Sequence, residues 1–157
     1  MIILETTKDS DLEQLAIERL AKAYNLTTIK MPQFSAIDYI TQGRIVAGVE
    51  IKTRKETPQQ IREYGKPILK WRKYEELLTL SELMKMNVYV LFAFENAQGE
   101  MFTLSIKELA KTNPLPKDPP IRRNYRGLAC DEEPVIYFDW DLLIQVGDRV
   151  EKNPLVV

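Results

Sequence analysis

The segment from Arg44 to Thr53 combines the pattern of a core strand with two charged side chains. Its odd-numbered positions are Ile, Ala, Val, Ile and Thr, the two-residue periodicity of a strand with one buried face. Glu50 and Lys52 fall on the opposite face, about 6 to 7 Å apart along the strand. Any fold that buries this segment must therefore place a carboxylate and an ammonium group side by side.

The segment just before it carries a third charge. Residues Ser35–Thr41 form a short apolar run with Asp38 at its centre, and we expect a strand there that neighbours the first. Unpaired charges in such positions are costly to desolvate, so they need a partner, a metal ion or a catalytic role.

Bulk composition removes several classes of function. The 157 residues, 45% of them hydrophobic, suit one globular domain spanning residues 1–157. Without a long apolar stretch or a signal-like start, the sequence favours a soluble, cytoplasmic protein. The chain has no histidine, which excludes Ser-His-Asp and Cys-His catalysis and histidine zinc sites. Cys130 is followed by acidic residues, so we expect an ordinary side chain rather than a nucleophile.

The order of predicted elements indicates an α/β fold with an αβββαβ core, a central mixed sheet flanked by helices, and an extra C-terminal strand and short helix. We expect a long helix that begins at Pro67 and ends at about Met86. Its core candidates are Ile68, Trp71, Leu77, Leu78, Leu80, Leu83 and Met84. The predicted helices are 9–25, 57–64 (helical or irregular), 67–86, 107–111 and a short one capped by Asp139; the predicted strands are 26–31, 35–41, 44–53, 88–94, 100–105 and 135–138.

Positive charge is unevenly distributed, although the net charge is −1. Residues 50–73 hold eight Lys or Arg against three Glu, a local surplus of five positive charges. A second basic cluster is formed by Arg122, Arg123 and Arg126. Such runs are commonly solvated faces, but beside a carboxylate pair they can hold phosphates.

An acid on one strand and Glu-x-Lys on the next outline a magnesium site. Magnesium takes hard oxygen ligands and usually keeps several waters, so two or three carboxylates with a backbone carbonyl and a phosphate oxygen suffice. Such an ion can lower the pKa of a bound water, and Lys52 can orient that water or stabilise the developing charge.

Asp38 and Glu50-Ile51-Lys52, in this element order, resemble the PD-(D/E)XK nuclease superfamily, and the resemblance runs from Glu13 to Phe94. It implies a restriction-endonuclease-like fold and a Mg²⁺-dependent DNA endonuclease, with Mn²⁺ able to substitute. Asp38, Glu50 and Glu13 of the first helix would be the metal ligands, with Glu18 the alternative to Glu13. Asp38, Glu50 and Lys52 would be the catalytic residues.

The segment Lys70–Glu75 resembles the opening of the second helix in small resolvase-like and phage or homing-type members, where a lysine faces the site; Lys73 matches it. The tail from Arg122 to Tyr137 resembles the same proteins more loosely. The resemblance implies double-stranded or branched DNA as partner and a homo-oligomer. The residues implied to hold the DNA backbone are Arg54, Lys55, Lys70, Lys73, Arg122, Arg123 and Arg126.

Two departures leave alternatives open. Ile37 stands where the superfamily name has proline, and Gln60–Tyr64 imitates the Gln-x-x-x-Tyr element of the exonuclease-like branch, although it follows Lys52 closely. The rival hypotheses are a non-catalytic DNA-binding or protein-interaction module on the same fold, and an unrelated α/β protein with surface ion pairs. The sequence does not choose between DNA and RNA, or between recognition by sequence and by shape.

Overall fold

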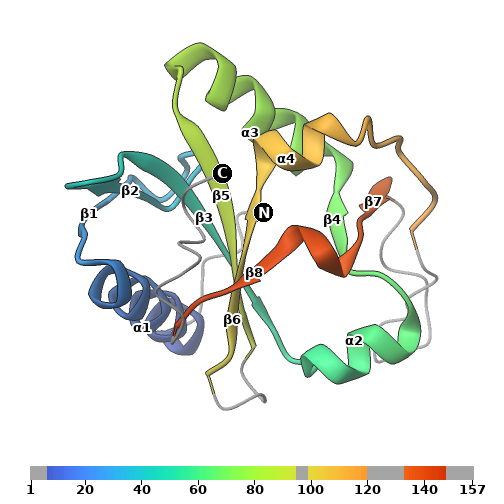
Figure 1. Cartoon of the computed structure of the whole chain (residues 1–157), viewed down its shortest axis with the longest axis horizontal. Helices are drawn as coiled ribbons and strands as arrows, with labels where there is room; N and C mark the ends of the chain where they lie inside the picture. Colours follow the sequence, from blue (N-terminus) through green and yellow to red (C-terminus); the bar gives the residue numbers. More distant parts are fainter. Residues whose placement is uncertain (1–6, 95–98, 120–132, 148–157) are drawn as a thin grey trace.

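The computed structural model describes residues 7–94, 99–119 and 133–147 of the chain. Figure 1 shows the helices and strands formed by these residues. Their bounds are α1 (Thr7–Tyr24), β1 (Thr27–Lys30), β2 (Tyr39–Gln42), β3 (Ala47–Arg54), α2 (Pro58–Tyr64), β4 (Ile68–Lys70), α3 (Trp71–Met84), β5 (Asn87–Phe94), β6 (Met101–Ser105), α4 (Ile106–Lys111), β7 (Val135–Tyr137), the 3₁₀ helix η1 (Trp140–Leu142) and β8 (Leu143–Gln145).

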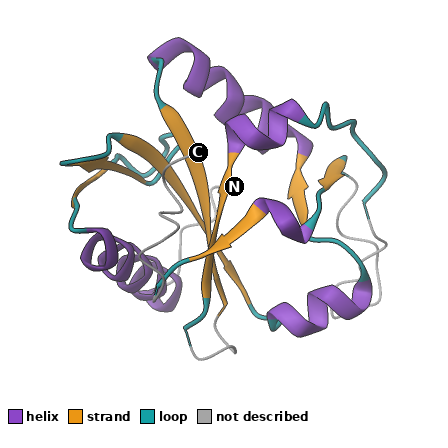
Figure 2. Ribbon diagram, viewed as in Figure 1, coloured by secondary structure: helices purple, strands orange, loops and turns teal. Residues whose placement is uncertain are grey.

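A six-stranded mixed sheet forms the centre of the fold, in the order β1-β2-β3-β5-β6-β8. Strands β3 and β5 are parallel, and the other pairs are antiparallel. Figure 2 shows helices on both sides of this sheet. The predicted α/β architecture with a central mixed sheet flanked by helices is therefore confirmed.

The two faces of β3 pack against different cores. Its odd-numbered residues Ala47, Val49 and Ile51 are buried with α1, in a cluster that includes Ile17 and Leu20. Its even-numbered residues lie beside Val88, Val90 and Phe92 of β5, which pack against α3. The two-residue periodicity predicted for this strand is confirmed, and it directs Glu50 and Lys52 to the α3 side.

The helix predicted from Pro67 begins instead at Trp71. Residues Ile68–Lys70 form β4, which pairs antiparallel with β7 in a separate two-stranded sheet. Two of the core candidates are also wrong, because Leu83 is 76% exposed and Met84 is 58% exposed. Within α3, Tyr74 and Leu77 are buried against the sheet.

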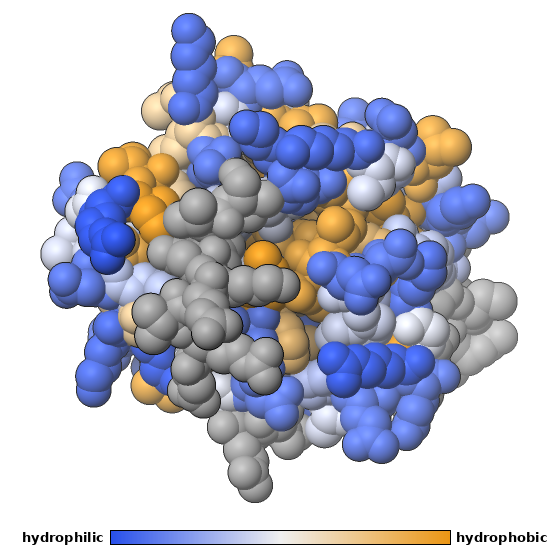
Figure 3. Space-filling view, viewed as in Figure 1, coloured by the Kyte–Doolittle hydropathy of each residue, from blue (hydrophilic) through white to orange (hydrophobic). Residues whose placement is uncertain are grey.

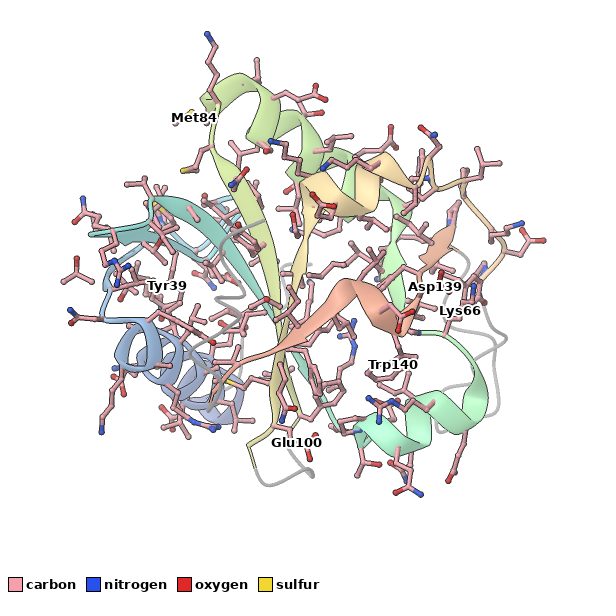
Figure 4. All side chains as sticks on the ribbon, in the orientation of Figure 1. Tyr39, Lys66, Met84, Glu100, Asp139 and Trp140 are labelled. Atoms are coloured by element: carbon pink, nitrogen blue, oxygen red, sulfur yellow. The ribbon has the colours of Figure 1, made fainter. Side chains whose placement is uncertain are left out.

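The C-terminal part differs from the prediction as well. The expected strand is present as β7, but it pairs with β4 and not with the central sheet. Asp139 occupies the predicted N-cap position of η1, but its side chain makes no capping hydrogen bond and forms an ion pair of 2.7 Å with Lys66. Trp140 lies beside that pair (Figure 4), with the Arg62 guanidinium 4.6 Å above its ring. Strand β8, the outermost strand of the central sheet, was not predicted.

Figure 3 shows that hydrophilic residues cover most of the visible surface, with an exposed hydrophobic patch near the centre of the view and smaller ones at its edges. Within the described part of the chain, no helix combines the length and apolar character needed to cross a bilayer. Among the residues that the structure describes, three large apolar side chains are more than two-thirds exposed: Phe34, Leu83 and Leu115.

Candidate active site

Asp38 lies one residue before β2, and not in the middle of a strand as predicted from residues 35–41. Its main-chain N–H donates to the Val49 carbonyl at 3.0 Å. Its carboxylate oxygen Oδ2 accepts a hydrogen bond of 2.7 Å from the Ile51 N–H. The side chain thus replaces a β2 backbone acceptor just before β2 begins, which fixes the carboxylate next to Glu50 and Lys52.

Two neighbours fix the direction of the Asp38 side chain. Ile37 is buried in the core on the α3 side, whereas Tyr39 is buried in the core on the α1 side. The backbone therefore changes sides at Asp38, and β3 continues to Arg54 although its ladder with β2 covers Ala47–Val49. Beyond Val49, β2 therefore no longer pairs with this edge of β3.

Glu50 is the most buried charged side chain of the site, at 6% exposure. Its Oε2 lies 3.3 Å from Nζ of Lys73, and its Oε1 lies 3.8 Å from Nζ of Lys52. Lys73 also contacts Glu76 at 3.4 Å and the Ala36 carbonyl at 3.5 Å. Two ammonium groups and two carboxylates are therefore gathered in one partly buried cluster.

Burial is the main reason why Glu50 retains its proton more tightly than an exposed glutamate does. Burial and the nearby Asp38 carboxylate raise the pKa of Glu50 from 4.5 to about 7, against the opposing effect of Lys52 and Lys73.

The two lysines respond to the cluster in opposite directions. Burial lowers the pKa of Lys52, and Glu50 offsets part of that effect. Burial also lowers the pKa of Lys73, but Glu50 and Glu76 outweigh it and leave that pKa above 10.5. Lys73 is therefore held as a cation, while Lys52 is the amine whose proton is more weakly bound.

Two contacts fix the segments that carry Lys73 and Asp38. The Trp71 N–H at the start of α3 donates to the Pro134 carbonyl at 2.9 Å, which fixes the first turn of the helix. On the other side, Gly48 leaves room for Ile37, because a Cβ at this position would lie 2.9 Å from the Ile37 Cδ1. The glycine thus lets the residue before Asp38 enter the core.

The donor set suits a magnesium ion in part. Asp38 and Glu50 supply two carboxylates of the hard-oxygen kind, and waters or phosphate oxygens commonly complete such a shell. However, the described residues contain no group of three or more Asp, Glu, His or Cys side chains able to hold a metal together. Glu13 is half-buried on α1, on the far side of the sheet from Glu50, so its role as a third ligand stays a prediction.

The predicted DNA-backbone residues are scattered. The Arg54 guanidinium lies 5.4 Å from the Phe92 ring centroid, and Lys55 is exposed. Lys70 is exposed and lies 3.4 Å from Glu133, whereas Lys73 belongs to the Glu50 cluster itself. The cluster Arg122, Arg123 and Arg126 lies outside the described residues, as does Cys130.

Sequence reasoning did not find Glu76. It stands one turn after Lys73 on α3 and gives that lysine a second carboxylate partner. The available signal was the i,i+3 spacing of Lys73 and Glu76, a common surface pairing on helices. Nothing in that spacing showed that the lysine would reach a strand residue 23 positions earlier.

Among solved structures, the chain is similar to that of Archaeoglobus fulgidus Hjc, a Holliday junction resolvase from an archaeal hyperthermophile. The TM-score is 0.52 at 17% sequence identity, over 83% of this chain and 84% of that one. The chain therefore shares the fold of this resolvase, as expected from the restriction-endonuclease-like element order. Neither a protein-family profile nor a curated protein matches the sequence.

Proposed function

We propose that the protein is a divalent-metal-dependent DNA endonuclease that hydrolyses phosphodiester bonds. The observation that carries the proposal is the convergence of Asp38, Glu50, Lys52 and Lys73 beside the start of β2. The fold shared with a Holliday junction resolvase supports a nuclease.

Asp38, Glu50, Lys52 and Lys73 have roles that their positions support, whereas the role of Glu13 is proposed from the sequence resemblance alone. Asp38 and Glu50, with Glu13 as a third candidate from α1, would hold Mg²⁺ or Mn²⁺. When bound, the ion lowers the pKa of a water ligand and neutralises charge on the phosphate. Lys52, with its lowered pKa and its amine 3.8 Å from Glu50, can donate a hydrogen bond to the attacking water or to a phosphate oxygen. Lys73 holds the Glu50 carboxylate in place.

The DNA backbone would be contacted by Arg54, Lys55, Lys70 and the cluster Arg122, Arg123 and Arg126, so binding should weaken steeply with salt. We also propose that the protein acts as a homo-oligomer, because cutting two strands of a duplex or branched DNA requires two such sites.

The test is cleavage of plasmid and four-way-junction DNA with and without Mg²⁺, using wild type, Lys52→Ala and Lys111→Ala. Lys111 is an exposed lysine of α4, paired with Glu108 at 2.7 Å, and serves as the matched control. We expect Lys52→Ala to lose about 100-fold or more of the rate, as is typical for loss of a proton-transfer group, with Lys111→Ala unchanged. Cleavage by both variants at the wild-type rate would indicate a contaminating nuclease, and absence of cleavage by wild type would favour a non-catalytic binding module.

A further inference from the structure

The loop that leads into Asp38 is anchored at both ends and presents an aromatic side chain at its tip. The Met31 N–H donates to the Asp38 carbonyl at 2.8 Å and closes the loop. Inside it, the Ser35 N–H donates to the Pro32 carbonyl at 2.9 Å, which makes residues 32–35 a tight turn. Phe34 occupies the third position of this turn and is 77% exposed.

The exposure of Phe34 does not follow from a frayed backbone. Ile37, three residues later, is 3% exposed, and Met31 packs partly buried against the same core. The third position of a tight turn favours Gly, Asn, Asp or Ser, so the turn itself gives no reason for a phenylalanine. The fold thus holds an aromatic ring in solvent on a fixed support.

The position of this ring relative to the acids suits a nucleic-acid base. Four residues of chain span at most about 14 Å, and successive nucleotides of one strand advance about 3.4 Å. Phe34 is therefore within reach of bases one to four nucleotides from a phosphate at Asp38. The loop also touches the start of α3 through Lys73 and Ala36, and exposed Lys30 and Arg72 flank these two segments.

We propose that Phe34 stacks on a nucleobase beside the cleaved phosphate, so that the preferred substrate presents an unstacked base at this point. An intact duplex hides the faces of its bases, whereas an unpaired base offers one to the ring. The proposal rests on the proposed function and specifies what the same site recognises.

The experiment is a protein–DNA double-mutant cycle in EDTA, read by fluorescence anisotropy. The probes are a duplex, the same duplex with a three-nucleotide bulge, and that bulge with abasic nucleotides. The proteins are wild type, Phe34→Ala, Phe34→Trp and Leu83→Ala, the last an equally exposed apolar residue at 76%. Base–aromatic stacking of the usual strength predicts that Phe34→Ala binds the bulge about 10-fold or more weakly.

Phe34→Trp should retain that affinity, Leu83→Ala should match wild type, and Phe34→Ala should lose nothing on the abasic bulge or the duplex. Equal binding of the bulge by wild type and Phe34→Ala overturns the proposal, and so does a loss that is the same on all three probes. Failure of wild type to bind the bulge overturns it as well. A change in oligomeric state of Phe34→Ala with unchanged DNA affinity would assign the ring to a protein contact instead.

The two proposals fail separately. Because the binding assay contains EDTA, it needs no hydrolysis. Cleavage of DNA by a protein whose Phe34→Ala variant binds like wild type would retain the nuclease and remove the stacking role. Base-dependent binding through Phe34 without cleavage would retain the stacking role and remove the nuclease.

Discussion

Replacing Glu50 by glutamine should stabilise the metal-free protein in neutral and alkaline solution. The folded state binds the Glu50 proton more tightly than the unfolded chain, because its pKa is raised from 4.5 to about 7. As the pH rises from 4.5 to 7, the unfolded chain releases this proton while the folded protein retains it, so the free energy of unfolding falls. Above the folded pKa the loss is complete. Glutamine keeps the shape of the protonated side chain and removes the titration.

The magnitude follows from the two pKa values. The pKa values of Glu50 in the unfolded and folded states differ by about 2.5, which corresponds to about 3 kcal/mol of stability. About 2 to 3 kcal/mol of this stability is lost between about pH 5 and about pH 8. Because Glu50 is 6% exposed, solvent screening reduces this effect little. This is a large share of the stability of an ordinary domain.

The assay is urea unfolding in EDTA across this pH range for wild type, Glu50→Gln and Glu63→Gln. Glu63 is an exposed glutamate of α2, so the same chemical change there should leave the pH dependence of wild type intact. We expect the stability advantage of Glu50→Gln to grow by about 2 to 3 kcal/mol from the acidic to the alkaline end. A constant or shrinking advantage would mean that Lys52 and Lys73 stabilise the Glu50 anion more than burial and Asp38 disfavour it.

Three further predictions test the packing and the metal site. Gly48→Ala should destabilise the fold by about 1 to 3 kcal/mol in urea unfolding, because its Cβ would meet the Ile37 Cδ1 at 2.9 Å; an unchanged midpoint would show that Ile37 moves freely. Leu77→Ala should lower the free energy of unfolding by about 2 to 5 kcal/mol, whereas Leu83→Ala on the exposed face should change it by no more than about 0.5 kcal/mol. Equal losses in the two variants would contradict the described orientation of α3. Magnesium should raise the melting temperature of wild type and not of Asp38→Asn, and an equal rise in both would locate the ion elsewhere.

The central strands and the Glu-x-Lys pair were predictable because their signal is local. In β3, two-residue alternation of apolar side chains decides which face is buried, and it leaves Glu50 and Lys52 on the other. Neighbouring residues of one strand are close whatever the rest of the fold does. The spacing alone therefore gave their proximity correctly.

Features that depend on distant partners were not predictable in this way. Pro67 followed by Ile68 and Leu69 fits a helix start, and β4 forms because Val135–Tyr137 supplies an antiparallel partner. Leu143–Gln145 is too short to be predicted as a strand from its sequence, and it forms β8 because it pairs with β6. The contact of Lys73 with Glu50 also joins two distant elements, and it was expected from the family resemblance of Lys70–Glu75 and not from spacing.

The small β4–β7 ladder affects the order in which parts of the molecule fold during synthesis. It ties Ile68–Lys70, immediately before the helix that carries Lys73, to a strand synthesised more than sixty residues later. Long-range pairings of this kind form late, since the entropy of closing the intervening loop opposes them. On a ribosome, a nascent chain that ends before Pro134 lacks the tie that fixes the first turn of α3. Synthesis thus delays assembly of the charged cluster until Val135–Tyr137 has emerged.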